Sequence, residues 1–250
     1  MNIFTKCILF SLSLFSLVFT CLTLFHFTQF ISDIPLVSCN TSAHQILLDK
    51  TDEDPVLYAT QATVIDVSLL CIFIIQHSSL LPLQDFLSET LRLPVLNRSF
   101  LNLFTSASLQ LLMHLWRPIP QYAVWVVSTE EPSRQLGFIT VHFICWLLIY
   151  ILMITMDITD FLGIKQVYYQ ATGRPAPATL KSQQLKSLHK KVRHPSFLGF
   201  LMIFWIHPFM RLDRLLLAVV WSLYMAVVWR PGVNDYNYVI QQQAAKRSVM

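Results

Sequence analysis

No charged residue occurs in the 26 positions between Lys6 and Asp33. A helix needs about 20 predominantly apolar residues to cross the hydrocarbon core of a bilayer. A cleaved signal peptide has a shorter apolar core of about 7–15 residues, followed by a cleavage pattern of small residues. No such pattern follows here. Residues 7–31 are therefore predicted to form a retained transmembrane helix.

The charge content of the chain is too low for a soluble protein. Charged residues make up 13% of the 250 positions and hydrophobic residues 54%, whereas a typical soluble domain carries about 25% charged residues. Together with a mean hydropathy of +0.53, these values exclude a disordered chain, a nucleic-acid-binding arm and an ordinary soluble enzyme. The 5 glycines are too few for a Gly-rich phosphate-binding fold. A bilayer must therefore cover most of the apolar surface.

Five more apolar segments follow the first predicted span. They are residues 56–83, which only Asp66 interrupts, and residues 99–116, 135–156, 195–210 and 215–229. The last two are short and lie on either side of Asp213 and Arg214, so we expect them to form a tight helical hairpin. The sequence thus predicts an all-α integral membrane protein in which residues 1–250 form a single membrane domain of about six transmembrane helices.

The connections between these segments differ in charge. Residues 32–55 contain five acidic residues and one lysine, whereas residues 157–194 contain seven basic and two acidic residues. With six spans, 13 of the 18 Lys and Arg residues fall on the side of the two termini. The positive-inside rule then places both termini and the basic loop 157–194 in the cytosol or nucleoplasm. The acidic loop 32–55 becomes lumenal, and Asn40 begins an N-x-S/T sequon within it, close to the first span.

Several polar side chains fall inside the predicted spans, where each is costly in hydrocarbon. These intramembrane polar residues are Asp66, His77, Gln110, His114 and His142. Asp66 and His77 are eleven residues apart, which at 100° per residue leaves them about 20° off a common helix face. Gln110 and His114 form an i,i+4 pair. Two interpretations stay open: a polar cavity that holds a ligand or passes protons, or interhelical hydrogen bonds that fix helix packing.

The basic segment 179–194 has an amphipathic pattern. Leu185, Leu188 and Val192 project on one side of a helical wheel, with Lys186 and Lys190 opposite. This pattern favours a helix at the membrane surface whose lysines contact anionic lipid headgroups. A solvated charged loop that obeys the positive-inside rule is an equal alternative. Nucleic acid is not an expected partner, because the segment has no interleaved aromatic residues and no known motif.

The residues that follow this segment form a candidate anion site. Pro195 suits the first turn of a helix, where its missing N–H is not needed. Arg193 and His194 precede that helix start, whose free N–H groups and partial positive charge attract a carboxylate or phosphate. The alternative is a helix start with basic residues near lipid headgroups. The spacing of Cys, His and acidic residues predicts no metal site.

The order of several motifs resembles the nurim family of multispanning proteins of the inner nuclear membrane. The resemblance is carried by R-H-P at 193–195, Gly199, Trp205, Pro208, D-R-L-L-L-A at 213–218, Q-H-S at 76–78, L-Q-L-L-M at 109–113, P-I-P at 118–120 and G-I-K-Q-V-Y-Y at 163–169. It extends over nearly the whole chain. It implies a multi-pass protein of the nucleus inner membrane.

The nurim family in turn is similar to the isoprenylcysteine carboxyl methyltransferase superfamily. Enzymes of that superfamily carry an R-H-P-x-Y-x-G motif that helps to enclose S-adenosylmethionine. Residues Arg193, His194, Pro195 and Gly199 match this motif, and the resemblance implies that they form a vestigial cofactor-binding site. Phe197 stands where the superfamily has tyrosine, so that hydroxyl is missing.

The second superfamily motif, an acidic E-E-R-D-L-type sequence, is mostly lost. It would fall at residues 232–236, where Asp235 remains but Gly232 and Val233 replace both glutamates. Methyl transfer needs the cofactor held in line with its acceptor, so lost anchoring groups are expensive. The expected function is thus a non-enzymatic membrane protein without cofactor or catalytic residues, with the lipid bilayer as its partner. The alternative is an S-adenosylmethionine-dependent methyltransferase that acts on a small lipophilic acceptor. A transporter is disfavoured, because the chain has no repeated halves.

Overall fold

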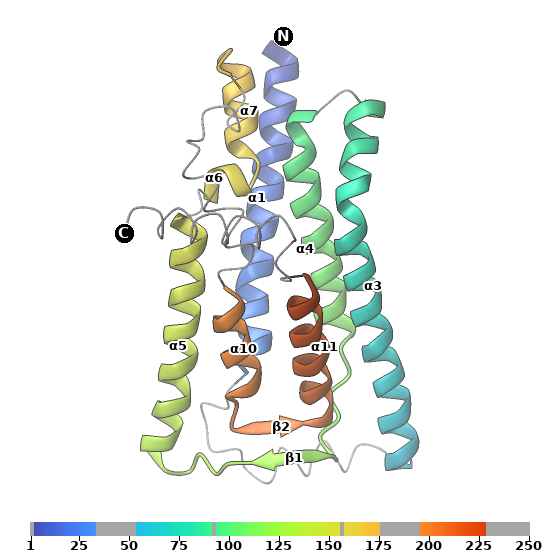
Figure 1. The fold of residues 1–250 in the computed structure, drawn as a ribbon, viewed down its shortest axis with the longest axis vertical. Helices are drawn as coiled ribbons and strands as arrows, with labels where there is room; N and C mark the ends of the chain where they lie inside the picture. The colour runs from blue at the N-terminus through green and yellow to red at the C-terminus, as the bar shows by residue number, and fades with distance from the viewer. Residues whose placement is uncertain (1–2, 34–53, 92–93, 156–157, 176–195, 229–250) are drawn as a thin grey trace, which may run out of the picture.

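The computed structural model of the chain describes residues 3–33, 54–91, 94–155, 158–175 and 196–228. Its helices are α1 (Ile3–Ile31), α3 (Pro55–Leu91), α4 (Asn97–Leu115), α5 (Pro132–Thr155), α6 (Ile158–Phe161), α7 (Ile164–Ala171), α10 (Phe197–Trp205) and α11 (Leu212–Val228), with a 3-10 turn η1 (Pro94–Leu96) before α4. Strands β1 (Ala123–Val126) and β2 (Phe209–Arg211) pair antiparallel. In Figure 1 the long helices α1, α3, α4 and α5 run along the molecule, the short α10 and α11 occupy its lower half, and the β1–β2 ribbon lies beneath them.

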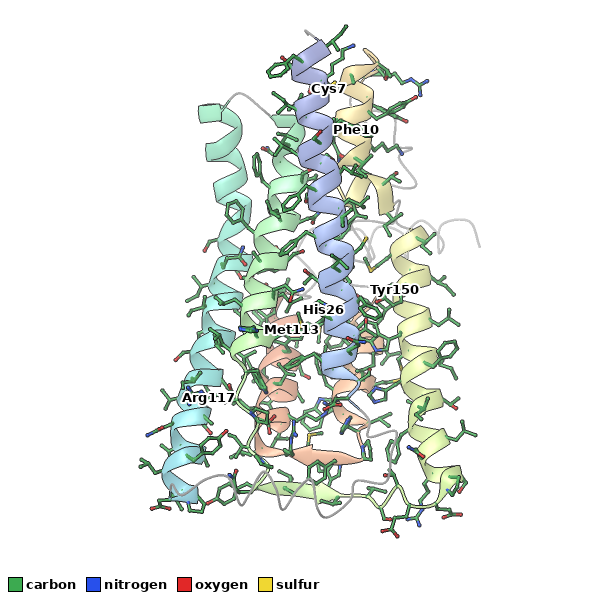
Figure 2. All side chains as sticks on the ribbon, turned by 180° about the vertical axis from the view of Figure 1, so that it is seen from behind. Cys7, Phe10, His26, Met113, Arg117 and Tyr150 are labelled. Atoms are coloured by element: carbon green, nitrogen blue, oxygen red, sulfur yellow. The ribbon has the colours of Figure 1, made fainter. Side chains whose placement is uncertain are left out.

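Three of the helices are long and apolar enough to cross a membrane. They are α1, residues Pro55–Ser79 of α3 and residues Pro132–Ile154 of α5, and they coincide with the predicted spans 7–31, 56–83 and 135–156. Large apolar side chains face outward on them, as with Phe15 (59% exposed) and Phe143 (65% exposed), and Figure 2 shows the side chains that project from these helices. Such exposure suits a lipid environment, which is as apolar as a protein interior. The prediction of a mostly helical membrane protein is confirmed.

Helix α1 buries small polar residues against α4 rather than large apolar ones. The Ser16 hydroxyl donates to the Ser99 carbonyl at 2.7 Å, and the Ser99 hydroxyl donates to that of Ser13 at 3.2 Å. Two turns further along α4, the Ser106 hydroxyl donates to that of Thr20 at 3.2 Å. Small side chains let two backbones approach closely in a membrane, and their hydroxyls add interhelical hydrogen bonds. A polar seam therefore joins α1 to α4.

Helix α4 corresponds to the predicted span 99–116. It has 19 residues, which is about 28 Å at the helical rise of 1.5 Å per residue. It lies between α1 and α3 (Figure 1) and packs against both. Its polar seam makes it less apolar than the three helices above, and its crossing of the membrane stays a prediction.

The segment expected to form the fifth span, residues 195–210, folds differently. Helix α10 ends at Trp205, and its 9 residues extend about 14 Å, less than half of a hydrocarbon core about 30 Å thick. The chain leaves the helix at Ile206 because Pro208 cannot donate a helical hydrogen bond and disfavours helical geometry at the residue before it. Residues 209–211 then form β2. The connection between α10 and α11 therefore lies at residues 206–211.

The sixth predicted span, residues 215–229, is observed as α11, which begins earlier, at Leu212. The expectation that the hairpin turns around Asp213 and Arg214 is thereby corrected. Both residues lie in the first turn of α11 and are buried there. The pairing of β2 with β1 extends the connection and brings these charged residues under the bundle.

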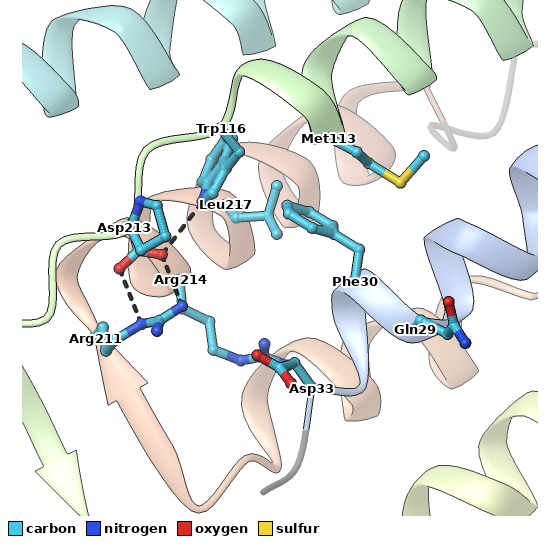
Figure 3. Close-up of a pocket in the computed structure, with 10 residues that line it drawn as sticks. Gln29, Phe30, Asp33, Met113, Trp116, Arg211, Asp213, Arg214 and Leu217 are labelled. Atoms are coloured by element: carbon cyan, nitrogen blue, oxygen red, sulfur yellow. Dashed lines mark hydrogen bonds and ion pairs between the residues drawn. The ribbon is translucent and has the colours of Figure 1, made fainter. Parts of the chain in front are cut away.

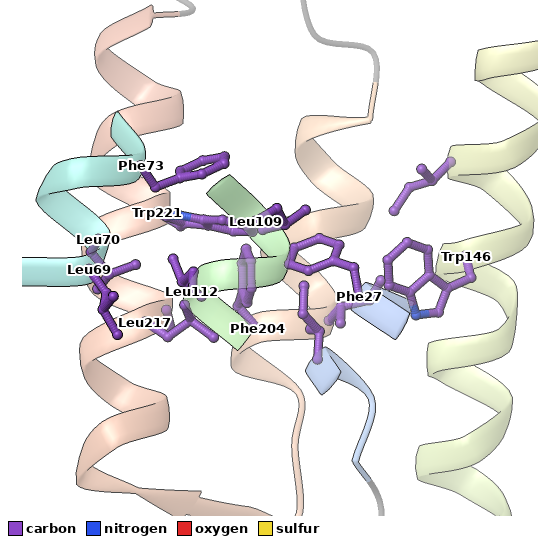
Figure 4. Close-up of a cluster of buried hydrophobic side chains, with 14 of the residues drawn as sticks. Phe27, Leu69, Leu70, Phe73, Leu109, Leu112, Trp146, Phe204, Leu217 and Trp221 are labelled. Carbon is purple, nitrogen blue, oxygen red and sulfur yellow. The ribbon is translucent and has the colours of Figure 1, made fainter. Parts of the chain in front are cut away.

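A cluster of aromatic rings holds the short helices α10 and α11 against the rest of the bundle (Figure 4). Between ring centroids, Trp221 of α11 lies 5.0 Å from Phe27 of α1, 5.4 Å from Phe204 of α10 and 5.5 Å from Phe73 of α3. The Trp146 ring of α5 meets Phe27 edge-on at 6.4 Å. Aromatic pairs at such spacings contribute about 0.5–1.5 kcal/mol each beyond the burial of their area. Rings from five helices thus fix the position of the hairpin.

At the opposite end of the bundle, α6 and α7 fold back beside α1 (Figure 1). Gly163 joins them with a φ of 88°, which glycine adopts without strain. A Cβ atom there would lie 2.5 Å from the Ser99 hydroxyl oxygen. The Lys6 ammonium of α1 donates to the Ala171 carbonyl at 2.7 Å. This corner is therefore attached to both α1 and α4.

An exposed ion pair marks the start of α5. The Arg134 Nε atom lies 3.0 Å from the Glu131 carboxylate, and both side chains are at least half exposed. A hydrogen bond from Ser133 and the positive charge of Arg134 lower the pKa of the Glu131 carboxyl. The pair makes a surface contact and no contact with the buried groups described below.

Gly199 of α10 packs directly on α5, which makes it a test of this interface. An added Cβ would lie 2.9 Å from Ile149 Cγ1 and 3.3 Å from the Cys145 carbonyl oxygen. We expect Gly199→Ala to lower the free energy of unfolding by about 1–3 kcal/mol, the usual effect of overpacking. Thermal unfolding in detergent measures this change.

Gly137 is the matched control, because it is a helical glycine of α5 with no atom within 4 Å of a Cβ added there. Gly137→Ala should leave stability unchanged or raise it slightly. Equal midpoints for the two variants would contradict the α10–α5 contact.

Candidate functional site

Asp213 is the centre of a polar cluster at the lower end of the bundle in Figure 1, where α1 ends. Its side chain is 1% exposed. It accepts hydrogen bonds from the indole Nε1 of Trp116 at 3.2 Å and from the backbone N–H of Ile119 at 3.1 Å. The guanidinium of Arg211 approaches both of its oxygens at 3.2 Å (Figure 3). Its charge is therefore paired and both oxygens are bonded.

Asp66 of α3 contacts the same stretch of chain. It is fully buried, and its Oδ1 accepts a hydrogen bond from the backbone N–H of Arg117 at 3.0 Å. Its Oδ2 has no hydrogen-bond partner among the described residues. Asp66 and Asp213 thus hold residues 116–119, which leave α4, from two different helices.

Arg214 is the second buried charge in the first turn of α11. It is 6% exposed, and one terminal N–H donates to the Ile31 carbonyl at the end of α1. Its Nε is buried without a hydrogen-bond partner among the described residues. Within this described part of the chain no carboxylate forms an ion pair with it. We refer to Asp66, Arg211, Asp213 and Arg214 as the polar cluster.

A cavity of about 400 Å³ opens beside the polar cluster. It lies between the end of α1, the end of α4 and the first turns of α11 (Figure 3). Its lining combines the polar residues Gln29, Asp33, Arg211, Asp213 and Arg214 with the apolar residues Phe30, Met113, Trp116, Pro118 and Leu217. The cavity therefore has one charged wall and one apolar wall.

Two buried histidines tie α5 and the α10–α11 connection to the end of α1. The Nε2 atom of His142 donates to the Ile206 carbonyl at 2.7 Å, because a carbonyl oxygen can only accept. Its Nδ1 then accepts from the Ser32 hydroxyl at 2.9 Å, and Ser32 in turn accepts from the indole N–H of Trp146 at 2.7 Å. Both ring nitrogens of His142 are bonded and the Ser32 hydroxyl both donates and accepts, which is typical of a structural network.

His207 forms the neighbouring set of contacts. Its Nε2 donates to the Asp33 carbonyl at 3.2 Å, and its Nδ1 accepts from the N–H of Phe209 at 3.2 Å. The rings of His207 and His142 lie 5.9 Å apart. Both rings therefore orient the loop that replaces the end of the expected fifth span.

The intramembrane residues singled out in the sequence do not form one site. Although Asp66 and His77 both point away from lipid, His77 contacts Thr105 of α4 at 3.3 Å and stacks on Phe73, three turns from Asp66. Gln110 donates to Thr23 at 3.2 Å on the α1–α4 seam.

The i,i+4 pair of the third predicted span also separates. Gln110 contacts His26 of α1 at 3.0 Å, whereas His114 is exposed. Asp66 and His142 are the two predicted residues that the structure brings to the lower end.

Most of the vestigial cofactor site lies outside the described residues. This applies to Arg193, His194 and Pro195, and to Gly232, Val233 and Asp235. The basic segment 179–194 and Asn40 lie outside them as well. Gly199 is described and is buried against α5. The described residues contain no group of three or more His, Cys, Asp or Glu side chains that could hold a metal ion.

The sequence did not predict that four residues belong to this buried region. They are Arg211, Asp213, Arg214 and His207. The adjacent charges of Asp213 and Arg214, between two apolar segments, were the available signal, and they indicated a turn. The same two charges would have indicated two buried residues at the start of a helix only if the strand at residues 209–211 had been recognised first.

A bundle with membrane-crossing helices and a buried polar cluster defines a multi-pass helical membrane protein. Comparison with known proteins identifies its family. Over 186 residues, 73% of this chain, it is 39% identical to the protein named Nurim from Xenopus laevis, of which the match covers 65%, slightly less than two thirds. It is 37% identical to Nurim from Danio rerio (73% of this chain, 67% of the relative) and 35% identical to Nurim from Homo sapiens (72% and 70%).

The chain belongs to the nurim family. No family model matches it, and no solved structure does.

The contact between Asp66 and Arg117 gives a direct test of the polar cluster. Asp66→Leu leaves the part-buried N–H of Arg117 without its acceptor, which costs up to about 1–3 kcal/mol, the penalty for a fully buried donor. We expect a lower midpoint of thermal unfolding in detergent. Asp66→Asn, which keeps a carbonyl oxygen at the same place, should lose less. An unchanged or higher midpoint for Asp66→Leu would contradict a structural role for this carboxylate.

Proposed function

We propose that this chain is a non-enzymatic, six-span membrane protein of the inner nuclear membrane, built on a scaffold related to membrane methyltransferases. Membership of the nurim family and the three membrane-crossing helices support the proposal. The described helices also alternate in direction, α1 down, α3 up, α4 down, α5 up, α10 down and α11 up in the view of Figure 1. Six such passes put both termini on one side.

The basic segment 179–194 is assigned to the cytosolic or nucleoplasmic side in this proposal. Its lysines contact anionic headgroups there, each worth about 1 kcal/mol near the membrane surface. The acidic segment 32–55 lies on the lumenal side. The short α10 is held in place by the aromatic cluster around Trp221.

The observation that carries the non-enzymatic assignment is the loss of cofactor-anchoring groups. Phe197, the first residue of α10, offers no hydroxyl where the related enzymes have tyrosine, and Gly232 and Val233 offer no carboxylates. Charge-assisted hydrogen bonds contribute about 1.5–3 kcal/mol each, and every 1.4 kcal/mol changes a dissociation constant about tenfold. Losing two or three of them weakens binding of S-adenosylmethionine by several powers of ten. Two of the described buried polar side chains, His142 and Asp213, are engaged by partners within the protein.

The proposed location and orientation can be checked together by immunogold electron microscopy. The full chain carries an epitope tag at its C-terminus. We expect gold particles at the nuclear envelope, on the nucleoplasmic face of the inner membrane. Particles in the perinuclear space, or only over the peripheral endoplasmic reticulum, would contradict the orientation or the location respectively.

Isothermal titration of the detergent-purified chain with S-adenosylmethionine tests the absence of enzymatic function. We expect no binding in the micromolar range. A micromolar dissociation constant that disappears in Arg193→Ala would support the alternative, a methyltransferase for a small lipophilic acceptor. Arg174→Ala, which removes an exposed arginine at the end of the described α7 region, serves as the matched control.

A further inference from the structure

The cavity under the bundle has the two-sided lining of a site for an amphiphile. Arg214 and Arg211 lie on one wall, and Phe30, Trp116 and Leu217 form the other (Figure 3). Its volume of about 400 Å³ falls in the range of about 300–1,000 Å³ that is typical of small-molecule sites. The space suffices for a headgroup and the first carbons of its chains, and not for a whole lipid.

Arg214 is the arginine of the polar wall that forms no ion pair with a described carboxylate, although the charges of Asp33 and Asp213 act on it from a greater distance. A guanidinium has five N–H donors, and here one bond, to the Ile31 carbonyl, is made while Nε is buried and unpartnered. Asp213 already pairs with Arg211 and accepts from Trp116 and a backbone N–H. Asp33 also lines the cavity, but it is exposed and forms no ion pair with Arg214 among the described residues. A buried, unpaired cation is costly unless an anion accompanies it.

The position of the cavity along α1 fits the boundary between hydrocarbon and headgroups. Large apolar side chains remain exposed on α1 as far as Phe25, which is 58% exposed. The cavity begins one turn later, at Gln29, and extends to Asp33. A lipid whose chains lie beside Phe25 therefore has its headgroup at the level of Arg214.

We propose that this cavity binds the headgroup of an anionic phospholipid, with its phosphate on Arg214. Guanidinium and phosphate form charge-assisted, bidentate hydrogen bonds, which the free N–H groups of Arg214 can supply. The glycerol and the first methylenes of the chains lie on Trp116, Phe30 and Leu217, and the rest of each chain stays in the bilayer. Gly199, the described residue of the vestigial cofactor motif, does not line the cavity, and the proposal does not depend on whether S-adenosylmethionine binds.

Calorimetric titration of the full detergent-purified chain with dioctanoyl phosphatidic acid tests the proposal. Dioctanoyl phosphatidylcholine and inorganic phosphate are the comparison ligands. We expect phosphatidic acid to bind at least tenfold more tightly than either, and Arg214→Gln to weaken its binding at least tenfold. Arg134→Gln is the matched control, because Arg134 is an exposed arginine paired with Glu131 at the start of α5, and it should leave binding unchanged.

A second variant keeps the test decisive if Arg214→Gln does not fold. Met113 lines the cavity and is partly exposed, so Met113→Trp fills the space and leaves every charge in place. It should weaken phosphatidic acid binding at least tenfold. Equal binding of inorganic phosphate would reduce the site to one for a free anion, and equal binding of phosphatidylcholine would reduce it to an apolar cleft. Either of these two results would overturn the proposal. So would binding of phosphatidic acid that Met113→Trp leaves unaltered, or no binding of phosphatidic acid at all.

Discussion

The buried carboxylates of Asp66 and Asp213 determine the structure of the lower end of this membrane protein. When α4 ends, the backbone N–H groups of the next residues lose their helical partners and need other acceptors. Asp66 accepts from the N–H of Arg117 and Asp213 from that of Ile119. An unsatisfied buried donor costs about 1–3 kcal/mol, so these bonds determine the path of the chain from α4 to β1. The ribbon of β1 and β2, and with it the start of α11, follows from that path.

The end of α1 is the other fixed point of the same region. Its Ile31 carbonyl, Ser32 hydroxyl and Asp33 carbonyl receive hydrogen bonds from Arg214, Trp146 and His207. These donors come from α5, from the α10–α11 connection and from α11. The aromatic cluster above them holds the hairpin against the bundle by ring packing, without hydrogen bonds between the rings. The directional bonds at the end of α1 select one register for the hairpin.

The sequence predicted the long helices well because their cause is local. Charge-free stretches of sufficient length identify α1, α3 and α5 wherever they occur, and their bounds agree closely with the predicted spans. The prediction that the fifth helix continues to residue 210 was wrong, because Phe209 to Arg211 form a strand only when β1 is beside them. Strand β1 lies more than eighty residues earlier in the chain. Hydropathy does not contain that information. Pro208 was a local sign that the helix ends, but the apolar residues around it suggested continuation.

The polar residues likewise divide into features with a local cause, which the sequence predicts, and contacts with distant residues, which it does not. The cost of burying a charge in hydrocarbon made Asp66 and His142 identifiable as inward-facing, whereas their partners, a backbone N–H and a serine at a helix end, carry no sequence signature. Asp213 and Arg214 were interpreted as a turn because adjacent charges usually interrupt a span. The motif at residues 193–195 lies outside the described residues, so its interpretation rests on its local pattern and on the resemblance to a family.

The bonds at the end of α1 have a consequence for the order in which the protein is made. Helix α1 precedes the other described helices in the chain, and its seam with α4 can close once residue 115 has been synthesised. Its polar end must wait for His142, and then for Arg214, 183 residues after Ile31. A nascent chain that stops before α11 therefore holds a paired α1 and α4 with an open lower end. Of the described helices, α1 comes earliest in the chain and is among the last to gain all its contacts, so loss of α11 removes a contact at the end of α1.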